Sequence, residues 1–163
     1  LLILMIAATF TGRIITRFEN VLGSVVILTS FLPMLMNTGG SSGSQASTLV
    51  IRGLATGEIE MKDVFRVMWK EFRISILVGI TLAIVNFGRL MLIEKVEAHI
   101  AMTVSLTLIV TIMIAKIIGS LAPLAAKKLK LDPAIMAGPL ITTFVDAVTL
   151  TVYFSIASLL LNI

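Results

Sequence analysis

The sequence predicts an all-α membrane protein with five transmembrane helices, and three observations support this prediction. Hydrophobic residues make up 58% of the 163 residues, charged residues make up 13%, and the mean hydropathy is +1.08. A soluble domain has about a quarter of its residues charged, so this chain has too few charges to cover a water-soluble surface. The apolar segments reach the roughly 20 residues that a helix needs to cross a bilayer. They also lack the alternation of polar and apolar residues typical of outer-membrane strands.

Five apolar segments are candidate spans. The first is already apolar at Leu1, with no Met and no polar lead-in, so we expect residues 1–163 to be the membrane part of a longer protein. The fifth would be roughly 46 Å long as one helix, and we expect it to cross with tilt or to kink at Gly138 and Pro139. The five segments run from before residue 1 to about 15, from about 21 to 51, from about 74 to 93, from about 98 to 126, and from 133 to 163.

The basic residues predict how the chain is oriented in the membrane. If all five segments cross, the connections after the second and fourth segments lie on the same side. Eight basic residues belong to these two connections and four to the opposite side. The excess of basic residues places these connections, and therefore the N-terminus, in the cytoplasm and the C-terminus outside. The eight are Arg52, Lys62, Arg66, Lys70, Arg73, Lys127, Lys128 and Lys130, and the four are Arg13, Arg17, Arg89 and Lys95.

Residues 52–73, between the second and third segments, contain apolar residues at roughly helical spacing after Asp63. This pattern indicates a short amphipathic helix at the inner surface that leads into the third segment. Trp69 suits the depth of the membrane interface. A structured connector with no separate role is the alternative.

Asp146 and Lys116 are the two ionisable residues that we expect deep inside spans, where such residues usually face a partner or an aqueous path. Helical spacing places Gly138, Thr142, Asp146 and Thr149 on one polar or small stripe of the fifth segment. A carboxylate is a hard ligand that suits Mg²⁺, Ca²⁺, Na⁺ or H⁺. The stripe therefore predicts a cation path, and a buried Asp146–Lys116 ion pair is the alternative.

A polar run interrupts the second segment. It places three glycines, four serines, an Asn and a Gln at membrane depth between residues 37 and 47. Irregular backbone is tolerated at this depth only where protein or water satisfies its polar groups. We expect unwound backbone beside a pore, or small-residue packing between helices, and the two readings are compatible.

Other features exclude several kinds of site. The chain has no cysteine and a single histidine, His99, so it carries neither a disulfide framework nor a polyhistidine metal cluster. No basic run suggests nucleic-acid binding. Asp132 followed by Pro133 is typical of a helix start, and a cation site at the inner pore mouth is its alternative role.

Several motifs together resemble the membrane domain of the MgtE family of magnesium channels. They are LPM and TGGSSGSQ at 32–45, RGLATGEI at 52–59, DPA at 132–134, and GPLITTFVDAVTL at 138–150. The resemblance implies a homodimer whose pore, on the two-fold axis, is lined by the second and fifth helices. It also implies cytoplasmic N-terminal and CBS domains, which sense Mg²⁺, outside residues 1–163.

The resemblance also implies a set of metal-site residues. Asp146 would be the pore carboxylate that holds hydrated Mg²⁺, with Gly138 and Thr142 contributing backbone oxygens or lining. Asp132 would match the acidic residue that opens the last helix. The family commonly has Asn where Ser41 stands, so Ser41 offers a hydroxyl without an amide carbonyl.

These observations predict a channel that passes largely hydrated Mg²⁺ inward across an inner or plasma membrane, with Mn²⁺ or Ca²⁺ as substitutes at the site. Mg²⁺ gives up its waters reluctantly, and no covalent bond is broken, so we expect no enzyme. Two alternatives remain at this point. One is a proton- or sodium-coupled transporter in which Asp146 titrates, and the other is a non-transporting membrane anchor with the Asp146–Lys116 pair.

Overall fold

The computed structural model describes residues 2–18, 26–136 and 138–161, and all of its regular elements are helical. Short 3-10 turns precede three of the longer helices. In chain order the elements are α1 (Leu2–Arg17), η1 (Val26–Phe31), α3 (Leu32–Thr56), η2 (Met61–Asp63), α4 (Val64–Leu92), α5 (Ala98–Lys128), η3 (Pro133–Met136) and α6 (Pro139–Leu161).

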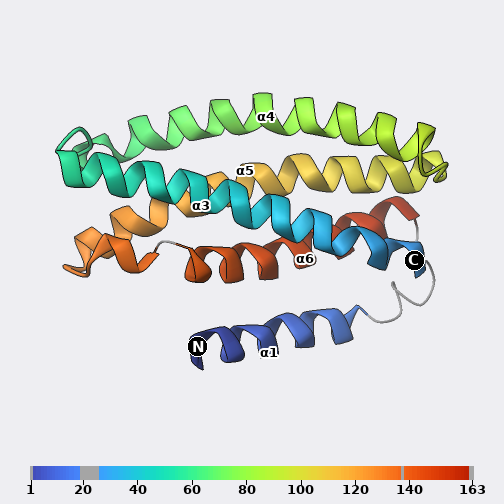
Figure 1. Ribbon diagram of the computed structural model, residues 1–163, viewed down its shortest axis with the longest axis horizontal. Coiled ribbons are helices and arrows are strands. Elements are labelled where there is room, and N and C mark those ends of the chain that lie inside the picture. The colour runs from blue at the N-terminus through green and yellow to red at the C-terminus, as the bar shows by residue number, and fades with distance from the viewer. Residues whose placement is uncertain (1, 19–25, 137, 162–163) are drawn as a thin grey trace.

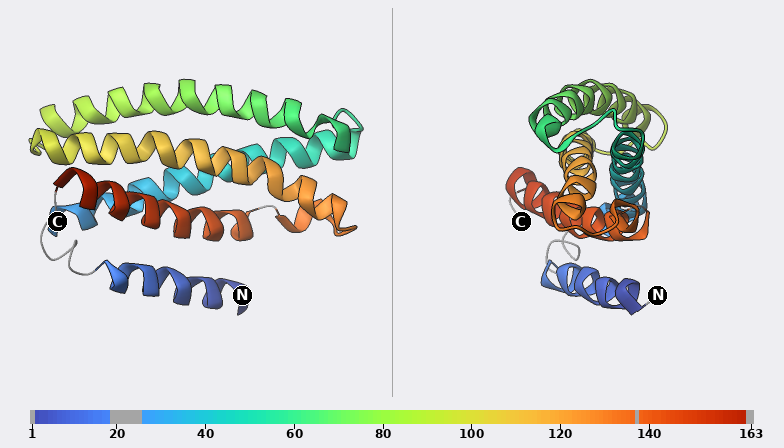
Figure 2. Two further views of the ribbon diagram at one scale, coloured as in Figure 1. Left: turned by 180° about the vertical axis from the view of Figure 1, so that it is seen from behind. Right: turned by 90° about the vertical axis from the view of Figure 1, so that its left-hand side faces the viewer.

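The long helices run side by side and alternate in direction (Figure 1). Helix α5 is central and packs against α3, α4 and α6, while α1 lies along α6 at one edge. The end-on view in Figure 2 shows α4 at the edge opposite α1. The α3–α4 and α5–α6 connections lie at one end of the bundle and the α4–α5 connection at the other, as the sequence predicts.

Three of the described helical segments are long and apolar enough to cross a membrane. They are Met61–Leu92, Ala98–Lys128 and Pro139–Leu161. Helix α3 has 25 residues but carries the polar run, and α1 has 16 residues in the described part. Among the described residues, α1 and α3 therefore do not reach the length and hydropathy of a span, and five crossings remain a prediction.

The predicted unwinding of the polar run is wrong, because α3 continues without a break from Leu32 to Thr56. Pro33 lies in its first turn, where a helix needs no N–H donor at that position. The glycines serve close packing instead. A Cβ on Gly119 of α5 would come within 2.8 Å of the carbonyl carbon of Gly43, so α3 and α5 cross with their backbones in contact, as small residues permit in membranes.

Helix α4 differs from the predicted third segment. The amphipathic stretch is not a separate helix: it is continuous with the apolar one, and α4 begins at Val64 instead of near residue 74. The backbone N–H of Glu60 donates to Asp63 Oδ2 at 3.0 Å, which stabilises the turn before the helix. Because no Gly or Pro interrupts residues 64–78, nothing in the backbone separates the interfacial part from the apolar part.

The fifth predicted segment is divided where the sequence contains Gly138 and Pro139. Gly138 has a φ of 66°, a left-handed conformation that glycine adopts readily. Helix α6 then begins at Pro139, whose fixed φ suits a first helical position. The predicted 31-residue segment is therefore a short η3 and a 23-residue α6.

The largest buried cluster joins η1, α3, α4, α5 and α6, with residues of α1 packed against it, near the end that carries the α4–α5 connection. Phe18 stacks on Phe154 with ring centroids 5.0 Å apart. The Tyr153 hydroxyl donates to the carbonyl oxygen of Leu28 at 3.0 Å, so its polar group is satisfied inside the cluster. This cluster holds α6, which carries Asp146, against α3 and α5.

Candidate ion-binding site

Asp146 lies in the middle of α6 and is half-buried against α3. A Cβ built on Gly40 would lie 3.7 Å from Asp146 Oδ1 and 3.2 Å from the Cγ2 atom of Thr142. The missing side chain at Gly40 therefore lets the Asp146 turn of α6 approach the backbone of α3. The structure thus brings together two features that the sequence singled out separately, the polar run and Asp146.

The outer face of α3 carries a polar stripe. Asn37, Ser41, Gln45 and Thr48 are all exposed and follow one another at spacings of three or four residues, which places them along one side of the helix. Ser41 adjoins Gly40 and so lies beside the Asp146 turn. Polar side chains exposed at membrane depth are costly against lipid, so this face needs water or another protein surface against it.

The hydroxyls near the start of α6 are engaged by their own helix. Thr142 and Thr143 donate to the carbonyl oxygen of Pro139 at 3.0 and 2.8 Å. The carbonyl oxygen of Gly138 accepts the Thr142 N–H at 3.1 Å. Carbonyl oxygens have two lone pairs, so Gly138 retains acceptor capacity, whereas the Pro139 carbonyl already accepts two hydroxyls.

Thr149, one turn beyond Asp146, does not share the exposed side of the helix. It is buried, and its Oγ1 atom would lie 3.0 Å from a Cβ on Gly39. Its hydroxyl finds no hydrogen-bond partner among the described residues. The predicted stripe is therefore split, with Thr142 and Asp146 half-buried and Thr149 inside the bundle.

Lys116 pairs with Glu71 and not with Asp146, so the predicted alternative pair is wrong. Its Nζ atom lies 3.1 Å from Glu71 Oε2, and the two side chains are only 8% and 6% exposed. The sequence reading placed Glu71 in a polar connection; because α4 begins earlier, Glu71 is inside the bundle. No local signal in the sequence connects these two residues, which lie 45 positions apart, because Glu71 is seen to be buried only once α4 is known to begin at Val64.

Asp132 caps η3, as its position before Pro133 predicts. The Ala134 N–H donates to Asp132 Oδ1 at 2.9 Å. Asp132 is exposed at the end of the bundle that carries the α3–α4 and α5–α6 connections. Cap and pore-mouth roles are compatible, because the carboxylate of this exposed residue has a second oxygen that can accept hydrogen bonds.

One chain alone does not gather a multidentate metal site. Within residues 2–18, 26–136 and 138–161, no three His, Cys, Asp or Glu side chains lie close enough to hold an ion. Asp146 is thus a single carboxylate on a polar surface. Water or a symmetry-related copy would have to supply further oxygen ligands to a cation there.

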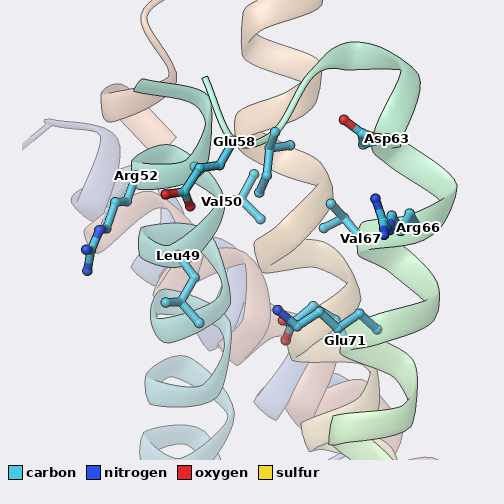
Figure 3. Close-up of a pocket in the computed structure, with 11 residues that line it drawn as sticks. Leu49, Val50, Arg52, Glu58, Asp63, Arg66, Val67 and Glu71 are labelled. Atoms are coloured by element: carbon cyan, nitrogen blue, oxygen red, sulfur yellow. The ribbon is translucent and has the colours of Figure 1, made fainter. Parts of the chain in front are cut away.

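A cavity of about 590 Å³ lies elsewhere, between the ends of α3 and α4, and sequence reasoning missed it (Figure 3). It contains none of the predicted metal-site residues. Charged side chains alternate with apolar ones around it, and Glu71 reaches its wall. The cavity is lined by Leu49, Val50, Arg52, Gly53, Glu58, Ile59, Asp63, Arg66, Val67, Lys70 and Glu71.

Comparison with known proteins gives one consistent result. Residues 32–156 match the family model MgtE, described as divalent cation transporter. The magnesium transporter MgtE of Thermus thermophilus is 34% identical over 99% of this chain and 36% of its own length. The proteins of the same name from Bacillus subtilis and Enterococcus faecalis are 38% and 27% identical over 97% and 99% of this chain. The chain spans about a third of the length of these relatives.

Proposed function

Since the chain belongs to the MgtE family of divalent cation transporters, we propose that it forms the pore of a Mg²⁺ channel. In this proposal two copies associate around a two-fold axis, α3 and α6 line the path, and Asp146 selects the ion. The channel would require no chemical step, in keeping with relatives that are named as transporters. Cytoplasmic regulatory domains outside residues 1–163 would gate it.

One observation carries the proposal: a single chain leaves a polar face open at membrane depth. The exposed stripe of α3 from Asn37 to Thr48 borders the half-buried Asp146 of α6. Lipid is a poor neighbour for such a face. A second copy related by two-fold symmetry would present the same polar face. The two polar faces together would enclose a hydrated conduit.

Two Asp146 carboxylates near one axis would repel each other in a pore of low dielectric constant. A divalent cation between them relieves this repulsion. Because Mg²⁺ dehydrates reluctantly and requires octahedral geometry, we propose that it passes with most of its water. Those waters would donate hydrogen bonds to Asp146, to the Ser41 hydroxyl, and to the remaining lone pair of the Gly138 carbonyl, with Thr142 as lining.

The charge distribution supports an inward direction. Eight basic residues belong to the end of the bundle with the α3–α4 and α5–α6 connections, which we assign to the cytoplasm of an inner or plasma membrane. With a negative interior, moving one charge inward is favourable by about 2.3 kcal/mol per 100 mV. The ion would then leave past Asp132, whose exposed carboxylate lies at this end.

The decisive experiment measures Mg²⁺ uptake by proteoliposomes that contain the full-length protein. Asp146→Ala should abolish or strongly reduce uptake, and Asp146→Asn should remove the preference for divalent over monovalent cations. Glu97→Gln is the matched control, because Glu97 is an exposed carboxylate in the α4–α5 connection, at the end of the bundle opposite Asp132. This variant should transport normally. Wild-type uptake by Asp146→Ala would refute the assignment.

The same vesicles separate a channel from a coupled transporter. An imposed pH or Na⁺ gradient should leave the rate of Mg²⁺ uptake unchanged, while a negative interior potential should increase it. Uptake that requires either gradient would instead support titration or Na⁺ exchange at Asp146.

A further inference from the structure

The cavity between α3 and α4 has a lining that is both cationic and apolar. Arg66 and Lys70 lie one turn apart on α4, and the stem of Arg52 lines the α3 side. Figure 3 shows Val50 and Val67 between the two arginines. Leu49, more than half exposed, extends the apolar lining toward the surface of α3.

The carboxylates of the cavity neutralise these cations only in part. Glu71 pairs with Lys116 at 3.1 Å, and Asp63 accepts the N–H of Glu60 at 3.0 Å. Glu58 and Asp63 keep their negative charges, so the lining has three cations against two carboxylates once Glu71 is paired with Lys116. Throughout the described part of the chain, none of the three cations of the cavity, Arg52, Arg66 and Lys70, forms an ion pair. The cavity thus presents spare positive charge to any anion that enters it.

The buried Lys116–Glu71 pair makes the inner wall compatible with an anion. An unpaired carboxylate at Glu71 would repel a phosphate, but the ammonium group 3.1 Å away compensates its charge. Among the other charged side chains of the lining, the three basic residues Arg52, Arg66 and Lys70 outnumber the two acidic residues Glu58 and Asp63.

The position of the cavity along α4 indicates which anion it meets. Phe65 and Trp69 alternate with Arg66 and Lys70 and are both mostly exposed, while the following part of α4 exposes aliphatic residues such as Leu77. Exposed Trp beside basic residues at the end of an apolar helix is typical of the level of lipid headgroups. Basic pockets between membrane helices at this depth suit anionic headgroups.

We propose that this cavity binds an anionic phospholipid, with the phosphate held by Arg66 and Lys70. The glycerol backbone and the start of an acyl chain would lie against Leu49, Val50 and Val67. The mixed lining favours a lipid over free inorganic phosphate, which would contact only the basic groups. Because the cavity contains none of the metal-site residues, lipid binding and Mg²⁺ transport can be tested independently.

Trp69 offers a direct reporter, because it is the one tryptophan among the 163 residues and neighbours Lys70. In the full-length protein, with any tryptophan outside these residues replaced by Phe, quenching by brominated phosphatidylglycerol is compared with quenching by brominated phosphatidylcholine. A basic group near an anionic surface favours binding about fivefold. The wild type should therefore prefer phosphatidylglycerol by about fivefold or more, and Arg66→Gln with Lys70→Gln should bring the ratio close to one.

The matched control is Lys127→Gln with Lys128→Gln, which removes two exposed charges from the same end of the bundle but outside the cavity. It should keep the wild-type ratio, and thermal unfolding in detergent should show that all variants are folded. A wild-type ratio of one would overturn the proposal, as would an undiminished ratio in the Arg66 and Lys70 variant. An equal loss in the control would reveal diffuse attraction instead of a site. Displacement by millimolar inorganic phosphate would identify a soluble anion as the occupant and overturn the lipid assignment.

Discussion

Replacing Lys116 with Met should destabilise the protein far more than replacing both members of its ion pair. Lys116→Met leaves the Glu71 carboxylate 6% exposed and without its counter-charge at 3.1 Å. Breaking a buried pair by removing one partner costs about 3–5 kcal/mol. The converse change, Glu71→Leu, strands the ammonium group and should cost about as much.

The double variant Glu71→Leu with Lys116→Met should recover most of this loss. Both charges are then gone, and apolar side chains of similar size fill the space between α4 and α5. Replacing a buried ion pair in this way is often neutral or stabilising, by about 1–4 kcal/mol. The coupling free energy of the double-mutant cycle should therefore be at least about 3 kcal/mol, well above the values expected for exposed pairs.

The four proteins of this cycle can be compared by reversible unfolding in mixed detergent and SDS micelles. Arg89 and Glu94 give an exposed reference pair with an N–O distance of 2.8 Å, and their cycle should yield less than about 1 kcal/mol. If each single change at residues 71 and 116 costs less than about 1 kcal/mol, or if the double variant loses the sum of both, the pair is not buried as described. Mg²⁺ uptake by the folded double variant should persist, since the pair lies apart from Asp146.

Two further predictions concern the contact of α3 with α5 and the contact of α3 with a second copy of the chain. Gly119→Ala should destabilise the protein by about 1–3 kcal/mol in the same unfolding assay, because its Cβ would collide with the backbone of Gly43; Gly88→Ala, with nothing within 4 Å, should be neutral or up to about 1 kcal/mol stabilising. Residues 1–163 contain no cysteine, so Ser41→Cys, with any cysteine outside these residues replaced by Ser, tests the proposed dimer directly. Oxidation should cross-link two protomers on a non-reducing gel. Leu77→Cys on the apolar outer face of α4 should give no dimer. Equal destabilisation by the two alanines would contradict the contact between α3 and α5. Cross-linking at Leu77 but not at Ser41 would contradict the proposed dimer.

The sequence predicted the helices best where length and hydropathy decide the structure. The apolar lengths of α5 and α6 and the break at Gly138 follow from local properties, because Pro and Gly restrict or permit backbone angles wherever they occur. Helical spacing placed Asp146 on a polar side of its helix, but the contact between Asp146 and the polar run did not follow from the residues.

Where neighbours from other helices decide the structure, the sequence reading failed. Whether the polar run unwinds depends on what lies against its glycines. Gly119, 76 residues away from Gly43, has no side chain, so the helical backbone of α3 can pack directly against α5. The partner of Lys116 could not be chosen, because Glu71 reads as part of a polar connection until α4 is known to begin at Val64. The cavity beside it depends on three segments at once and has no local signature.

The turn at Gly138 interrupts the fifth predicted segment, whereas the third predicted segment is uninterrupted. Helix α4 is a continuous rod of 29 residues, roughly 44 Å long, so displacing one end must displace the other. Before α6 the chain instead contains a single residue with a left-handed φ and open space around it. The direction of α6 relative to η3, and with it the separation of Asp146 and Asp132, is therefore set in part by the backbone angles of Gly138.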